Sequence, residues 1–137
     1  MADIKFEDYS IKVKNAIADT AFGVVEECAG ELESQVKRNT RVKTSKTKNS
    51  FSHRTSKTDS GIESVIGSSE ENSIWEEFGT GDHALGGDGR KGGWYYVDDD
   101  GEGHFTHGKK PSRAFWRAYT ALKDAIIKRI EEAFRGL

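Results

Sequence analysis

The chain has 137 residues, of which 34% are hydrophobic and 32% are charged, and its net charge is −2. This length favours one domain with a modest core, and the three Trp and seven Phe argue against a disordered chain. The single cysteine, Cys28, excludes an internal disulfide and a multi-cysteine zinc site, and no apolar run is long enough to span a bilayer.

Apolar residues recur every three or four positions from about residue 7 to residue 38, which predicts one long amphipathic helix. Asp8 and Ser10 are candidates to cap its start. The apolar face consists of Ile11, Ile17, Ala21, Val24, Val25, Cys28, Leu32 and Val36. A helix on the order of 45 Å long exceeds the core of so small a domain. Part of it should therefore project or contact another chain.

Positive charge is concentrated just after this helix. Residues 34–58 carry +8, and the rest of the chain therefore carries −10, a separation that suits pairing with further copies or with an acidic partner. Residues 39–57 predict a flexible basic loop that leads into a polar strand. The candidate contacts to DNA or to a protein partner are Lys37, Arg38, Arg41, Lys43, Lys46 and Lys48. Because no nucleic-acid motif accompanies the charge, a merely solvated loop stays an alternative.

Three strands are predicted next. Residues 50–57 and 62–67 flank a turn signal and predict a β-hairpin, with Ile62, Ser64 and Ile66 on one face. Residues 74–81 predict a third strand that ends in a sharp turn at two glycines, Gly79 and Gly81. In this stretch we expect Trp75 and Phe78 to lie mainly in the core, with partner contact as the alternative. Glu76, Glu77 and Thr80 are expected at the exposed tip of this strand, where Glu77 and Thr80 orient the turn.

The remainder predicts a glycine-rich excursion over residues 82–110 and a closing helix over residues 112–135. The excursion includes a small hairpin formed by residues 94–97 and 103–106. Pro111 precedes the closing helix, Ser112 is its expected cap, and Gly136 is its expected end. Residues 1–137 thus predict a single α+β domain: two helices packed on a small antiparallel sheet, with a projecting hairpin or loop.

No catalytic constellation emerges from the sequence. Asp98, Asp100 and Glu102 resemble the start of a calcium loop, but Lys109 occupies the position that requires a bidentate Glu. A metal site at His104 and His107, with His83 and Asp82, is disfavoured because the two histidines would point to opposite faces of a strand. No serine or cysteine has the context of a nucleophile. We therefore expect neither enzymatic activity nor a cofactor.

Two motifs resemble those of the head–tail joining, or tail-completion, proteins at the neck of long-tailed phages. The first is Glu77-Phe78-Gly79-Thr80-Gly81, preceded by Trp75, and the second is Gly108-Lys109-Lys110-Pro111-Ser112-Arg113-Ala114-Phe115. The family often has Pro where this chain has Ala114 and Ala118, so the closing helix should be more regular here.

The resemblance covers nearly the whole chain and implies a structural role. It implies a ring of identical subunits, expected to be a hexamer, between the head connector or stopper and the tail tube. Genome DNA would pass through its lumen, and no membrane would be involved. The protein would reside in the virion neck, and in the host cytoplasm during assembly. The expected contact residues are Trp75, Glu77, Phe78, Gly79, Thr80, Gly81, Pro111, Arg113 and Phe115. A nucleic-acid-binding protein acting through its basic loop is the alternative from a different functional class.

Overall fold

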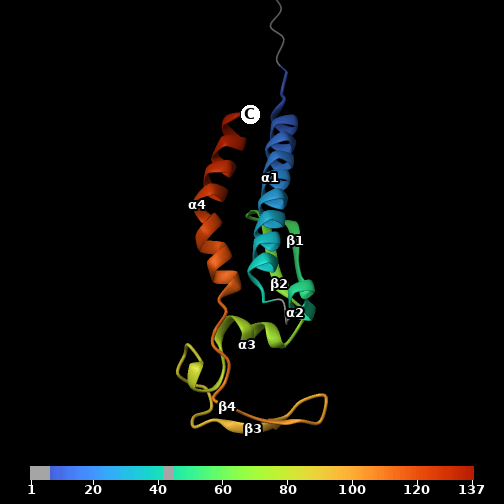
Figure 1. Ribbon diagram of the computed structural model, residues 1–137. Coiled ribbons are helices and arrows are strands. Elements are labelled where there is room, and N and C mark those ends of the chain that lie inside the picture. Colours follow the sequence, from blue (N-terminus) through green and yellow to red (C-terminus); the bar gives the residue numbers. More distant parts are fainter. Residues whose placement is uncertain (1–6, 42–44) are drawn as a thin grey trace, which may run out of the picture.

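Two long antiparallel helices, α1 (Ser10–Asn39) and α4 (Ala114–Arg135), lie side by side and form the spine of the molecule (Figure 1). The computed structural model describes residues 7–41 and 45–137. Within this part of the chain, no helix is long and apolar enough to cross a membrane.

Helix α1 begins close to its predicted start. The Asp8 carboxylate accepts the Ser10 backbone N–H at 2.9 Å, which lowers the pKa of Asp8 and satisfies one of the free donors at the helix start. The first turns project beyond the core, as expected from the helix length: Ile11 is 73% exposed and Val13 is 54% exposed. Buried residues appear only from Val24 onward.

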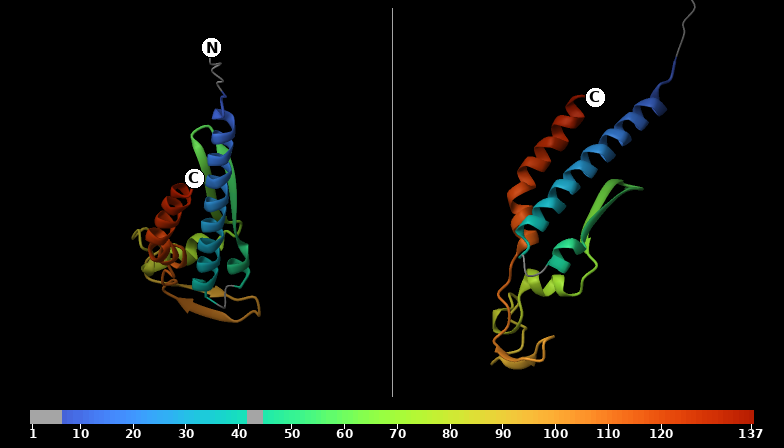
Figure 2. Two further views of the ribbon diagram at one scale, coloured as in Figure 1. Left: turned by 90° about the horizontal axis from the view of Figure 1, so that it is seen from above. Right: turned by 45° about the vertical axis from the view of Figure 1, so that its right-hand side comes forward.

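The antiparallel hairpin of β1 (Phe51–Thr58) and β2 (Gly61–Ser68) packs against α1 (Figure 2). The predicted inward face of β2 is confirmed, because Ile62, Ser64 and Ile66 are partly buried and alternate with exposed residues. The core consists of Leu32, Val36 and Ala118, with Phe51, Ile66, Phe115, Leu122 and Ile126 packed around them. Because Ala118 is small and fully buried, α4 can lie close to α1 at this point. The predicted α+β architecture is confirmed.

A histidine links this hairpin to α1. The ring of His53 in β1 is bonded through Nε2 to Glu26 at 2.7 Å and through Nδ1 to Glu33 at 2.8 Å. Glu26 also accepts the hydroxyl of Thr55. These bonds raise the pKa of His53, with Glu26 the larger cause, and they lower the pKa of Glu26, with Thr55 the larger cause. Two carboxylates facing one ring favour the doubly protonated imidazolium.

Two secondary-structure predictions are wrong. Residues 45–50, assigned largely to a loop, form the short helix α2 (Ser45–Ser50). The predicted third strand is instead the helix α3 (Asn72–Phe78), so each sheet has two strands within the described ranges 7–41 and 45–137. A run of seven residues is too short for its apolar spacing to distinguish a helix from a strand, and Ile74, Trp75 and Phe78 are residue types that favour a strand, so local preference pointed the wrong way.

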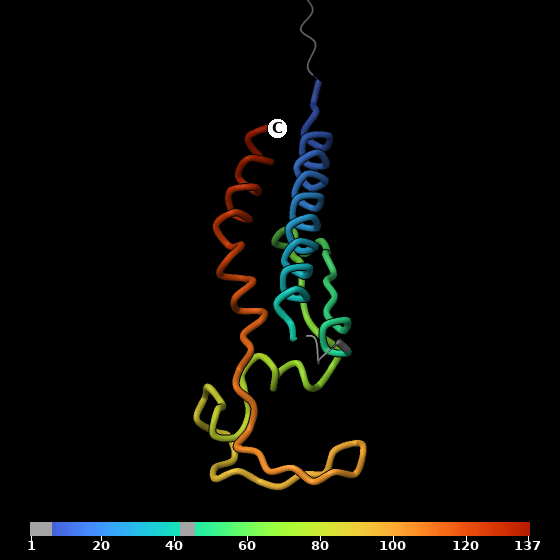
Figure 3. Tube along the Cα trace, in the orientation of Figure 1, coloured from blue at the N-terminus to red at the C-terminus, as the bar shows by residue number. Residues whose placement is uncertain are grey.

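The second hairpin is confirmed, and it stands apart from the rest of the molecule. Strands β3 (Trp94–Val97) and β4 (Gly103–Thr106) pair antiparallel, and their extensive contacts are only with each other. A short 3-10 helix, η2 (Gly81–His83), lies between α3 and this hairpin. Figures 1 and 3 place the hairpin at the end of the molecule opposite the C-terminus.

Candidate functional site at the α3–α4 junction

The two motifs noted in the sequence lie side by side. Thr80 donates its backbone N–H to the Lys109 carbonyl at 2.9 Å, and Lys109 donates its own N–H to the Thr80 hydroxyl at 2.8 Å. Asp82 then donates its N–H to the His107 carbonyl at 2.8 Å. These bonds join the chain segment that leaves α3 to the segment that returns from the β3–β4 hairpin and enters α4 (Figure 3).

Glycine is required where these two segments meet. Gly79 has φ 79°, and a Cβ there would lie 2.9 Å from the carbonyl oxygens of His83 and Lys109. Gly81 has φ 60°, and a Cβ there would collide with the His107 carbonyl oxygen. Both the left-handed backbone and the close approach exclude a side chain, so the turn predicted at these two glycines is confirmed.

Glu77 caps helix α4 from a distance in sequence. Its carboxylate accepts the backbone N–H of Phe115 at 3.0 Å and that of Trp116 at 2.9 Å. These donors belong to the first turn of α4, where no carbonyl of the helix is available and where the helix dipole favours a negative charge. Ser112 was the expected cap, but its buried hydroxyl has no hydrogen-bond partner among the residues that the structure describes, so that prediction is wrong.

Arg113 immediately precedes α4 in a left-handed conformation, with φ 55°. Its guanidinium carbon lies 5.3 Å from the centre of the Phe78 ring and 5.4 Å from that of Trp116. Its Nε is 4.0 Å from the Glu77 carboxylate. These cation–π and ionic contacts hold together the end of α3 and the start of α4.

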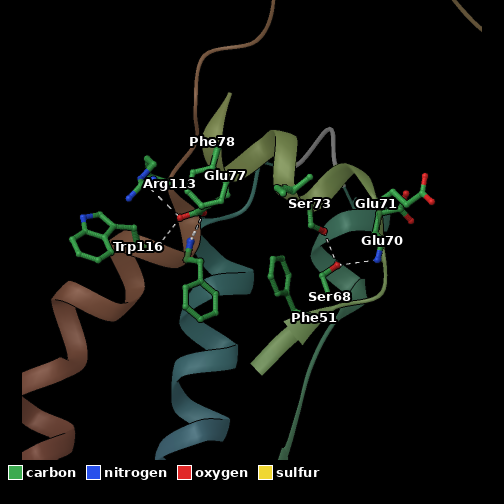
Figure 4. A pocket seen from close by; sticks show the side chains of 11 residues that line it. Phe51, Ser68, Glu70, Glu71, Ser73, Glu77, Phe78, Arg113 and Trp116 are labelled. Carbon is green, nitrogen blue, oxygen red and sulfur yellow. Dashed lines mark hydrogen bonds and ion pairs between the residues drawn. The ribbon is translucent and has the colours of Figure 1, made fainter. Parts of the chain in front are cut away.

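A groove of about 710 Å³ opens next to this junction (Figure 4). We call it the aromatic groove, and it is lined by Phe51, Ser68, Glu70, Glu71, Ser73, Ile74, Glu77, Phe78, Arg113, Phe115 and Trp116. At one side the Ser68 hydroxyl is 2.6 Å from that of Ser73 and accepts the Glu70 backbone N–H at 3.1 Å. Because its exposed surface is mainly apolar, although six of its eleven lining residues are polar or charged, the groove is suited to an apolar side chain or segment of a partner.

Glu76 holds the same junction from within, so the expectation that it lies at an exposed tip is wrong. It is 8% exposed, pairs with the Lys109 ammonium, and lies 4.0 Å from an Arg41 guanidinium nitrogen. Its backbone carbonyl accepts the Ser112 N–H at 2.7 Å. A buried carboxylate needs such partners. A glutamate followed directly by a second glutamate gives no sequence signal of burial, which explains why its burial was missed.

The predicted contact residues separate into three groups. Glu77, Phe78, Arg113 and Phe115 line the aromatic groove, which Trp116 completes without having been predicted. Gly79, Thr80, Gly81 and Pro111 form the joint beside it. Trp75 lies outside the groove and is 52% exposed, while Phe78 is 48% exposed. The prediction that these two rings lie mainly in the core is therefore wrong.

The candidate basic residues do not converge on one patch of free charge. Lys37 pairs with Glu33 at 3.4 Å, Lys46 pairs with Glu70 at 3.5 Å, and Arg38 donates to Gln35. Arg41 lies beside Glu76 and donates to the Lys110 carbonyl. Lys48 is in the last turn of α2, and Lys43 falls outside the described residues.

The titratable residues near the β3–β4 hairpin form separate local pairs. His104 bonds to Asp98 at 2.6 Å, whereas His107 bonds to Asp82 at 2.9 Å. Each histidine is the larger cause of a lowered pKa of its aspartate, with help from backbone N–H groups. Among the residues that the structure describes, Asp98, Glu102 and His104 form one group with ligand atoms within 4.8 Å of one another. Asp98 is already engaged by two backbone N–H groups that shape the turn.

Comparison with known proteins gives no further guidance to the function. No family model, curated protein or solved structure matches the chain.

Proposed function

We propose that this chain is a structural subunit at the neck of a long-tailed phage. It would join the DNA-filled head to the tail, or complete the head-proximal end of the tail, by forming a ring with copies of itself. Its neighbours would be the head connector or stopper on one side and the tail tube on the other. This role requires the chain to bind other proteins, and we assign the aromatic groove at the α3–α4 junction as a binding surface for a neighbouring protein.

The observation that carries this proposal is the meeting of the two resembling motifs in one joint. They are about 30 residues apart in sequence, yet they are joined by the reciprocal bonds between Thr80 and Lys109 and by the Glu77 cap on α4. A set of residues that maintains one three-dimensional joint is a more specific resemblance than two short motifs counted separately. The joint also determines where the exposed rings of Phe78 and Trp116 lie.

The exposed apolar surface supports an assembly role. Large apolar side chains contribute to this surface on α1, α3, α4 and the β3–β4 hairpin, as shown by Ile11, Ile74, Tyr95 and Trp116. Exposed apolar surface distributed over several elements is typical of a subunit with several neighbours.

The test is electron microscopy of particles from a phage or prophage in which this gene carries an early stop codon. We expect full heads and finished tails that lie apart, or tails of uncontrolled length, and the difference between these results distinguishes joining from tail completion. A wild-type copy supplied in trans should restore joined particles.

Normal, joined and infectious particles from the same mutant would overturn the neck assignment. The nucleic-acid alternative would then come first. It predicts that the purified protein binds DNA at low salt and that this binding weakens steeply as salt is raised.

A further inference from the structure

The β3–β4 hairpin, residues 94–106, which we call the arm, carries aromatic and apolar side chains that are half or more exposed in the part of the chain that the structure describes. Tyr95 is 81% exposed, Val97 is 70% exposed, and Phe105 is 50% exposed. The rings of Tyr95 and Phe105 pack edge to face at 4.9 Å, and Phe105 also packs edge to face on the ring of His107 at 5.2 Å. Because an isolated two-stranded hairpin is marginally stable in water, a surface that covers these rings would stabilise the arm.

The tip of the arm is strongly acidic. Asp98 is used inside the turn, where it accepts the backbone N–H groups of Asp100 and Glu102 and bonds to His104. The side-chain carboxylates of Asp99, Asp100 and Glu102 have no partner among the residues that the structure describes. The arm therefore presents an aromatic body followed by a cluster of unpaired negative charge.

A groove with the complementary character lies at the other end of the molecule. This distal groove, of about 850 Å³, is bounded by the first half of α1, the β1–β2 turn and the end of α4. Its larger apolar side chains are Ile17, Val25, Ile62, Ile130 and Phe134, with Ala18 and Ala21 between them. Lys14 and Lys57 also line it, with Asp59 the one acidic residue of the lining.

We infer that the arm of one copy docks in the distal groove of a neighbouring copy. The aromatic rings of the arm would cover the apolar lining, and Asp99 and Asp100 would face Lys14 and Lys57. The arm cannot fill the groove of its own chain, because the two lie at opposite ends of the molecule (Figure 1).

The contact is head-to-tail, since each copy contributes one arm and one groove. Such a contact generates a ring when the rotation between subunits closes, and an open filament when it does not. The inference rests on the proposed self-assembling neck subunit, to which it adds the two surfaces that meet. Opposite charges at the rim would select the correct pairing, and the apolar contact would supply most of the affinity.

The test is the mass of the purified full-length protein in solution, measured by light scattering and sedimentation up to about 1 mM, a concentration at which even the weakest specific contacts are populated. We expect the wild-type protein to form oligomers. D99K/D100K and K14E/K57E should each weaken this association at least ~10-fold, because like charges would then face one another across the contact.

Combining all four substitutions in one chain should restore association to within ~3-fold of wild type, because the charges are opposite again. A mixture of the two double mutants should also recover association beyond the dimer, because both contacts between unlike copies pair opposite charges: the reversed arm meets the reversed groove, and the native arm meets the native groove. Tyr95→Ser tests the apolar part and should weaken association at least ~10-fold. D88K/E63K makes the same charge change at exposed residues outside the arm and the distal groove, and should leave the mass unchanged.

A wild-type protein that is monomeric at the highest concentration would overturn the inference. So would charge reversals with no more effect than D88K/E63K, or a four-fold mutant that fails to recover. These results are distinguishable from failure of the neck role. If the early-stop phage loses joined particles while D99K/D100K supplied in trans restores them, the neck role stands and the docking contact is wrong.

Discussion

Replacing Glu77 with alanine removes the cap of α4 without touching the hydrophobic core. The side chain is 16% exposed, and its two hydrogen bonds at 3.0 and 2.9 Å serve donors that α4 cannot satisfy itself. A helix cap contributes about 0.5–2 kcal/mol and a hydrogen bond to a charged group about 1.5–3 kcal/mol. In the variant, water can hydrogen-bond to the exposed backbone N–H of Trp116, which reduces the loss in the free energy of unfolding. We therefore expect Glu77→Ala to lower the free energy of unfolding by about 2–3 kcal/mol.

The assay is urea unfolding followed by circular dichroism at the helix band, with Glu71→Ala as the matched control. Glu71 lines the same groove but is exposed and makes no side-chain hydrogen bond among the described residues, so its variant should change the free energy by less than about 0.5 kcal/mol. Glu77→Gln keeps one acceptor oxygen but loses the negative charge, so its free energy of unfolding should lie between those of Glu77→Ala and Glu71→Ala. Equal stabilities of Glu77→Ala and Glu71→Ala would refute the assignment of Glu77 as the cap.

Three further perturbations test other parts of the structure. Gly81→Ala should lower the free energy of unfolding by more than the ~1–2 kcal/mol of left-handed backbone strain, because its Cβ also collides with the His107 carbonyl oxygen. Gly87 has φ 69° and open space around it, so in the same unfolding assay Gly87→Ala should lose only the free energy of that strain. Val36→Ala should cost about 2–3 kcal/mol by thermal unfolding, because Val36 is fully buried, and a loss of under ~0.5 kcal/mol would contradict its place in the core. The bridge formed by His53 contributes stability that is fully present below its ordinary pKa of 6.5 and is lost as the pH rises through the raised pKa. The contribution of Glu26, whose pKa is lowered, is instead lost as the pH falls below its ordinary 4.5. The free energy of unfolding of the wild type should therefore decline above pH 6.5, and that of His53→Gln should decline much less. Parallel pH profiles of the two proteins would contradict a stabilising contact of His53 with Glu26 and Glu33.

Elements with a long or regular pattern were predictable from the sequence. The two long helices follow from apolar residues repeated over many turns, and the face of β2 that packs inward follows from a strict alternation. The turn at Gly79 and Gly81 was predictable because glycine is the residue that readily adopts a positive φ.

The sequence by itself therefore determined the helices, the hairpins and the position of the glycine turn, since these depend on spacing and on local backbone preference. Only the tertiary structure decided that residues 72–78 form a helix, that Glu77 and not Ser112 caps α4, and that Glu76 is buried. Each of these depends on a partner about 30 or more residues away, such as Lys109 for Glu76 or Phe115 for Glu77. A local pattern carries no information about such a partner, because the free energy of the contact exists only once the chain has brought both residues together.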